Sequence, residues 1–169
     1  MLVEKILTNK YSDFSDILLD SIFINLFVTG IFLIVYAFPV HRLLPEKYYI
    51  ISNPRFLKTF GHIIHIKLFK KLLLHTIWTR KQNKKYYFNG LRAGFEDFEM
   101  TTIKGEFGHF MGFCVVMILT ILIGLKTNLT ITLTILFINI FFNFYPILLQ
   151  RHHRLRIGEL KNRILIEND

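Results

Sequence analysis

Three long apolar stretches in this 169-residue chain limit what it can fold into. They run from about residue 17 to 40, from 106 to 125 and from 129 to 149. A helix needs about 20 mostly apolar residues to cross the hydrocarbon core of a bilayer, and each stretch is that long. Because unpaired backbone groups are costly in lipid, such stretches form helices. The sequence therefore predicts an all-α integral membrane protein with about three transmembrane helices.

The composition agrees with burial in lipid. Hydrophobic residues make up 52% of the chain, which is more apolar surface than a soluble domain of this length can hide. The single cysteine, Cys114, lies inside the second apolar stretch, so an internal disulfide is excluded and a small buried hydrophobe is the favoured interpretation. No cleavage site follows the first stretch, which is expected to remain as an anchor.

Basic residues flank the apolar stretches. The formal net charge is +9, which can indicate nucleic-acid binding, but charge placed beside membrane spans is the pattern of a protein facing anionic headgroups. We therefore expect membrane lipids as partners and no nucleic acid. Thirteen basic residues lie between 41 and 105, against four acidic ones, and five lie after 149: Arg42, Lys47, Arg55, Lys58, Lys67, Lys70, Lys71, Arg80, Lys81, Lys84, Lys85, Arg92 and Lys104, then Arg151, Arg154, Arg156, Lys161 and Arg163.

This charge distribution predicts a topology. The turn at 126–128 has one basic residue, and basic loops stay in the cytoplasm. The rule assigns 41–105 and the tail 150–169 to the cytoplasm, and the turn and the interfacial lead-in 1–16 to the outside. The prediction is a single multi-pass domain with its N-terminus outside and its C-terminus inside.

An amphipathic segment lies between the first two spans. Apolar residues recur at helical spacing over residues 56–78, where Lys67, Lys70, Lys71 and His75 interrupt them. These charges make a spanning helix costly. A helix in the membrane interface, with lysines reaching toward headgroups, fits the pattern better.

The second span opens with an ionisable pair. Glu106 and His109 are three residues apart and share one helix face. Ionisable groups at the head of an apolar span are expensive to desolvate, which makes them functional candidates. A carboxylate can fix the tautomer of an imidazole that then removes a proton from a hydroxyl. The alternative is structural: an acid in a first helical turn and a histidine satisfied by a backbone carbonyl.

The third span ends in amides and arginines. A short turn makes the second and third spans antiparallel neighbours, so this end should lie at the depth of Glu106 and His109. Asn143 and Gln150 are two helical turns apart on one face, although buried amides often only join helices. Three arginines follow, which can bind phosphate or carboxylate, or simply flank the span as the positive-inside rule requires: Arg151, Arg154 and Arg156.

Histidines and the cysteine could support two other chemistries. Five histidines could form a metal site like those of membrane desaturases, but such enzymes need more histidines at tighter, repeated spacing, and no metal is expected. Cys114 lies about eight residues inside the second span, with no base nearby in sequence, so it is a weak nucleophile candidate. The histidines are His62, His65, His109, His152 and His153.

Three motifs together resemble a known family. Leu44-Pro45-Glu46-Lys47-Tyr48-Tyr49 follows the first span, Glu106-x-x-His109 opens the second, and Asn143 precedes Gln150-Arg151-x-x-Arg154-x-Arg156 with Pro146 between. In order and approximate spacing these are similar to motifs of the glycosyl-4,4'-diaponeurosporenoate acyltransferase family, small bacterial membrane proteins. The resemblance covers roughly residues 40 to 160. His152-His153 departs from the Tyr-Asn often found there.

The resemblance implies transfer of a fatty acyl group onto a hydroxyl of a lipid or glycolipid acceptor, as in carotenoid biosynthesis, in a bacterial inner membrane. His109 would be the general base and Glu106 would orient it. Asn143 and Gln150 would position the acyl carbonyl or acceptor sugar. Arg151, Arg154 and Arg156 would hold the phosphates of the acyl carrier. No cofactor is implied, and the donor would be acyl-CoA or acyl-carrier protein.

A non-catalytic role competes with this interpretation. A three-span anchor with a lysine-rich interfacial helix also suits a small subunit or assembly factor of a membrane protein complex. A lipid-binding protein without turnover is a third possibility.

Overall fold

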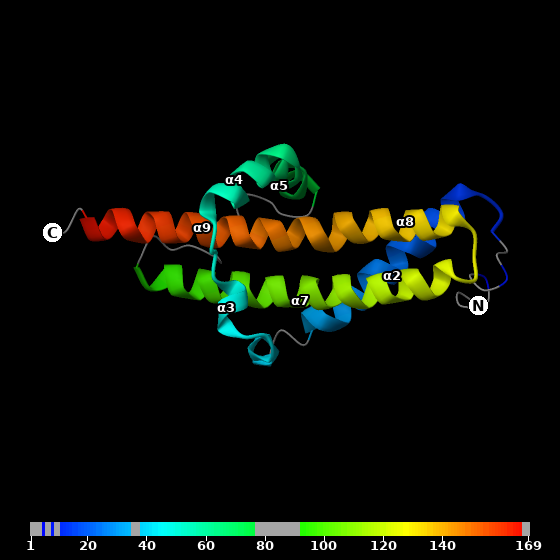
Figure 1. The fold of residues 1–169 in the computed structure, drawn as a ribbon, viewed down its shortest axis with the longest axis horizontal. Coiled ribbons are helices and arrows are strands. Elements are labelled where there is room, and N and C mark those ends of the chain that lie inside the picture. Colours follow the sequence, from blue (N-terminus) through cyan, green and yellow to red (C-terminus); the bar gives the residue numbers. More distant parts are fainter. Residues whose placement is uncertain (1–4, 6–7, 9–10, 35–37, 77–91, 167–169) are drawn as a thin grey trace. The chain divides into compact units, whose positions relative to one another are not determined.

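The structure, a computed structural model, describes residues 5, 8, 11–34, 38–76 and 92–166 (Figure 1). Within these ranges all regular secondary structure is helical, which confirms the all-α prediction. In the part of the chain that the structure describes, three helices are long and apolar enough to cross a membrane: Phe14–Ile34, Gly94–Gly124 and Leu129–Asn162. The elements are α2 Phe14–Ile34, the 3-10 helix η2 Val40–Leu43, α3 Glu46–Tyr49, α4 Pro54–Ile63, α5 Ile66–Thr76, α7 Arg92–Gly124, α8 Leu129–Asn139, the π-helix η3 Ile140–Phe144 and α9 Tyr145–Ile166.

The helices extend beyond the apolar stretches. α2 begins at Phe14, where the Asp13 carboxylate accepts a hydrogen bond from the Asp16 N–H (3.0 Å). α7 begins fourteen residues before Glu106, and α9 continues through the expected basic tail to Ile166. The reason is that lysine, arginine and glutamate are good helix formers, so a change from apolar to charged residues does not end a helix. Hydropathy identifies the spans and not the helix ends.

The chain divides into two compact units, which are described separately. The first comprises residues 1–40 and 107–146, and the second 41–106 and 147–169. In the first unit, α2, the second half of α7 and α8 share an apolar core of Ile17, Ile24, Val116, Ile131 and Ile135. The expected short turn joins α7 to α8, where the Asn128 side chain caps α8 by accepting from the Ile131 N–H (3.0 Å).

Two glycines let α7 approach α2 closely. A Cβ at Gly108 would lie 2.8 Å from Leu33 Cδ2, and one at Gly112 would lie 2.8 Å from Thr29 Oγ1. Glycines four residues apart form one small-residue face, a common feature of packed membrane helices. Thr29 is buried against this face.

A π-helical segment precedes the proline of the third span. In η3 the Tyr145 N–H donates to the Ile140 carbonyl, five residues back. Pro146 has no N–H to offer the carbonyl of Phe142, and its ring crowds that carbonyl. A wider local turn accommodates both effects, and such bulges are frequent at functional sites. Asn143 lies in this segment and is fully buried.

In the second unit the amphipathic segment forms two helices. α4 starts at Pro54, where Asn53 accepts from the Phe56 N–H (2.9 Å), and α5 follows after a break at His65. His65 has a φ of 53°, a left-handed conformation that histidine adopts more readily than most residues. The pattern over 56–78 predicted one helix, and its last two residues lie outside the described ranges.

Ion pairs connect the helices of the second unit. Lys58 of α4 binds Glu159 of α9 (2.5 Å), and Lys161 of α9 binds Glu99 of α7 (2.6 Å). The outer faces of α4 and α5 carry exposed apolar side chains beside lysines, as an interfacial helix requires. The exposed apolar residues are Phe56, Ile63, Leu68 and Leu72. Their location in the interface stays a prediction.

Candidate functional site

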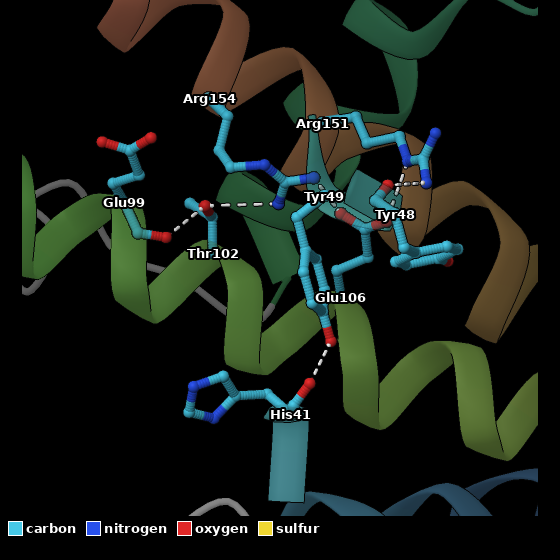
Figure 2. A network of polar contacts seen from close by, with 8 residues as sticks. All are labelled: His41, Tyr48, Tyr49, Glu99, Thr102, Glu106, Arg151 and Arg154. Carbon is cyan, nitrogen blue, oxygen red and sulfur yellow. Dashed lines mark hydrogen bonds and ion pairs between the residues drawn. The ribbon is translucent and has the colours of Figure 1, made fainter. Parts of the chain in front are cut away.

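A buried carboxylate lies between two arginines in the second unit. Glu106 of α7 is 0% exposed. Arg151 Nε donates to its Oε1 (2.8 Å), and Arg154 Nη2 donates to its Oε2. Because Arg151 and Arg154 are three residues apart on α9, both reach the same face of α7 (Figure 2). The predicted convergence of the second span's start with the third span's end is confirmed for these residues.

Two tyrosines of α3 cover the arginines. The Arg151 guanidinium carbon lies 4.9 Å from the Tyr48 ring centroid, and that of Arg154 lies 5.9 Å from the Tyr49 ring, both within cation–π range. Arg151 Nη2 also donates to the Tyr48 carbonyl (3.1 Å), and the Tyr49 hydroxyl donates to the His41 carbonyl (2.8 Å) (Figure 2). The Tyr48-Tyr49 motif therefore closes one side of the carboxylate–arginine cluster.

The cluster carries one positive charge in excess, because Glu106 faces two guanidinium groups. Arg154 is almost fully buried and reaches Thr102 Oγ1 through Nη1 (3.5 Å). Thr102 in turn donates to the Glu99 carbonyl (2.7 Å). The Arg151 side chain is 29% exposed, and Arg156 is exposed. Arg151 and Arg156 are therefore the arginines of this run that solvent can reach.

The environment of the cluster keeps its tyrosines neutral. Burial, reinforced by the Glu106 charge, raises the pKa of Tyr49 to about 12 and that of Tyr48 above its ordinary value. Since a neutral phenol is needed for the hydrogen bond from Tyr49 to His41, this shift preserves the contact over the physiological range.

We expect the Tyr49 hydroxyl to ionise near pH 12. Its pKa in the folded protein lies above the ordinary value of 10.0, so the stability it contributes is complete below pH 10 and is lost as the pH rises through about 12. The ultraviolet titration curve of Tyr49→Phe is subtracted from that of the wild type. The difference reports this one phenol among the seven tyrosines. A difference step centred near pH 10 would contradict the expectation.

In the first unit, His109 contacts a buried asparagine. Its Nδ1 lies 3.3 Å from Asn143 Oδ1. Asn143 Oδ1 also accepts from the Thr29 hydroxyl (2.8 Å). The amide nitrogen of Asn143 donates to Asn139 Oδ1 (2.9 Å) and Asn25 Oδ1 (3.4 Å).

The predicted residues thus have the following partners. Both Glu106 oxygens are bound by arginines, while His109 Nδ1 faces Asn143. That Glu106 orients His109 stays a prediction. Gln150 packs on Gly105 of α7, where a Cβ would lie 3.1 Å from the Gln150 amide nitrogen. The glycine therefore makes room for this side chain.

Several residues of these two networks are not among the predicted site residues. Tyr48 and Tyr49 belong to a family-like motif that assigns them no role. Asn25, Thr29 and Asn139 lie inside apolar spans, where a polar side chain is itself a signal of function. All three are buried.

His152, His153 and Cys114 lie outside these two networks. His152 packs against Gly61, where its imidazole occupies the space that a Cβ would need, and the ring centroids of His153 and Phe98 lie 5.6 Å apart. Cys114 is half-buried and has a free thiol. Within the described ranges no group of three or more histidine, cysteine or acidic side chains is arranged to hold a metal ion.

The chain was compared with known protein families. The sequence profile of glycosyl-4,4'-diaponeurosporenoate acyltransferases matches residues 45–163. The chain belongs to this family. The matched range includes Tyr48 and Tyr49 as well as every predicted site residue, and it confirms the resemblance inferred from the motifs. No curated protein and no solved structure matches the chain.

Proposed function

We propose that this chain transfers a fatty acyl group to a hydroxyl of a membrane-embedded glycolipid. The observation that carries the proposal is membership of an acyltransferase family over residues 45–163. The family is named for a glycosylated carotenoid acceptor, so a sugar hydroxyl of such a lipid is the proposed site of acylation. Three apolar helices would give the enzyme access to an acceptor dissolved in the bilayer.

The proposed reaction uses His109 as general base. The imidazole removes the proton of the acceptor hydroxyl, and the oxygen attacks the thioester carbonyl of acyl-CoA or acyl-carrier protein. A carbon–oxygen bond forms and the carbon–sulfur bond breaks. The imidazolium then returns its proton to the leaving thiolate. A base of this kind contributes about 10² to 10⁴ in rate.

The arginines divide into two proposed roles. Arg154 is buried against Glu106 and is assigned to holding α7 and α9 together. Arg156 is exposed and Arg151 partly so, which suits them to bind the phosphates of the donor. Gln150 is assigned to the acyl carbonyl or the acceptor sugar.

The proposed orientation has the N-terminus outside and the C-terminus in the cytoplasm of a bacterial inner membrane. Support comes from the basic residues between 41 and 105 and after 149. Glu106 and the arginine run would then lie on the side where acyl-CoA and acyl-carrier protein are made.

Transfer of labelled acyl chains tests the proposal. The protein in nanodiscs is given labelled acyl-CoA or acyl-carrier protein with a glycosylated carotenoid extract, and an alkali-labile labelled glycolipid is expected. Arg156→Gln should raise the donor KM about 10- to 100-fold through loss of a charged hydrogen bond. Arg55→Gln is the matched control, because Arg55 is an exposed arginine on α4. No labelled product with either donor would reject the proposal in favour of a non-catalytic subunit.

A further inference from the structure

His109 lies at the end of a hydrogen-bond chain whose direction is fixed by backbone carbonyls. The Asn139 amide nitrogen donates to the Phe113 carbonyl (3.1 Å), and the Asn25 amide nitrogen donates to the Ser21 carbonyl (2.9 Å). A carbonyl can only accept. Each asparagine must therefore give its nitrogen to the backbone and present its oxygen to Asn143.

The same logic fixes the amide of Asn143. The oxygens of Asn139 and Asn25 both accept from its nitrogen, at 2.9 and 3.4 Å. Its own oxygen is thereby turned toward Thr29 and His109. An asparagine side chain offers two donors and two acceptor sites, and all four are engaged. A fully satisfied, fully buried amide is poorly suited to bind substrate but well suited to orient a neighbour.

The orientation of Asn143 selects a tautomer of His109. An oxygen facing Nδ1 requires a proton on that nitrogen, and a neutral imidazole with its proton on Nδ1 has its lone pair on Nε2. This hydrogen-bond network contains no acidic side chain.

We propose that Asn25, Asn139 and Asn143 are positioning residues that hold His109 as the Nδ1–H tautomer, with Nε2 as the proton acceptor. This rests on the proposed function and deepens it, because Nε2 then takes the proton from a ligand hydroxyl. In this proposal Asn143 orients His109 and does not bind the acyl carbonyl or the acceptor sugar.

The tautomer can be read directly from ¹⁵N shifts of histidine-labelled protein. The His109 signals are identified by their absence in His109→Gln. The expected spectrum has a protonated Nδ1 and an unprotonated Nε2. A proton on Nε2, or on both nitrogens, in the wild type would overturn the proposal. The ¹⁵N spectrum does not depend on acyl transfer, so the tautomer can be confirmed even if no acyl transfer is found.

Variants then separate orientation from general packing. Asn143→Leu should mix the tautomers and lower kcat about 10²-fold or more with KM nearly unchanged. Gly112→Ala adds a methyl 2.8 Å from Thr29 Oγ1 and 3.1 Å from Asn143 Oδ1, and should disturb the same signals without removing a polar group.

A matched pair of threonines provides the control. Thr29→Val removes a donor to Asn143, while Thr120→Val removes a buried hydroxyl that bonds only its own helix, at the Val116 carbonyl (2.7 Å). Thr29→Val should shift the His109 signals and Thr120→Val should leave them unchanged. Equal spectra for wild type, Asn143→Leu and Thr29→Val would overturn the proposal, and the wild-type spectrum remains decisive if Asn143→Leu does not fold.

Discussion

Glu106→Leu is expected to lower the free energy of unfolding by about 3–5 kcal/mol, because the change leaves the buried Arg154 guanidinium without its counter-charge. Glu106→Gln keeps the shape and one acceptor, so it should cost less. The measurement is thermal unfolding in detergent micelles, followed by the circular dichroism of the helices.

A second ion pair of α9 provides the control for this change. Glu159 pairs with Lys58 at a site where the two side chains are 44% and 57% exposed, so Glu159→Gln should cost about 0–1 kcal/mol. Adding Arg154→Met to Glu106→Leu should recover stability, since removing both partners avoids an isolated buried charge. If Glu106→Leu were no less stable than Glu159→Gln, the cluster would not hold α7 and α9 together.

The second large effect is expected on catalysis. His109→Gln should reduce acyl transfer about 10²- to 10⁴-fold, because the variant lacks the base that removes the hydroxyl proton. The unfolding temperature should change little, since Asn143 Oδ1 keeps its hydrogen bond from Thr29 when the imidazole is gone. Initial rates in nanodiscs and thermal unfolding of the same preparation measure the two quantities.

His62→Gln is the matched control for the histidine change. His62 is exposed on α4, so its replacement should leave the transfer rate within about a factor of two of the wild type. A His109→Gln protein that retained the wild-type rate would exclude His109 as the base. Loss of activity together with early unfolding would instead assign His109 a structural role.

The sequence predicted the spans well because long apolar runs have few alternatives to a transmembrane helix. It also predicted that the start of the second span and the end of the third would lie at similar depth, since a short turn makes these spans antiparallel neighbours. Glu106 and the arginines at these two ends are in contact. Both inferences depend on chain connectivity and hydropathy alone.

Other contacts could not be derived in this way. A helix that is apolar on all sides has no amphipathic face, so the sequence does not fix its rotation about its own axis. The contacts from Asn25 and Thr29 to Asn143 depend on that rotation. Tyr48 and Tyr49 reach the arginines through a short helix far away in sequence, and such a pairing has no local signal.

The position of the Glu106-x-x-His109 motif illustrates the difference between spacing and contact. A carboxylate and an imidazole three residues apart on one helix are close enough to suggest that they form a pair. The structure provides each side chain with its own partners: two arginines for Glu106 and an asparagine for His109. Glu106 binds the arginines because their charges are opposite. His109 contacts the asparagine because its imidazole N–H needs an acceptor.

The lipid composition of cells tests the central claim most directly. Glycolipids are compared by mass spectrometry in three strains: one producing the wild-type chain, one lacking it, and one producing His109→Gln at the same membrane level. One glycolipid is expected to lose a single fatty acyl chain in both altered strains. A His109→Gln strain with the wild-type glycolipids, beside a deletion strain that lacks one of them, would contradict it.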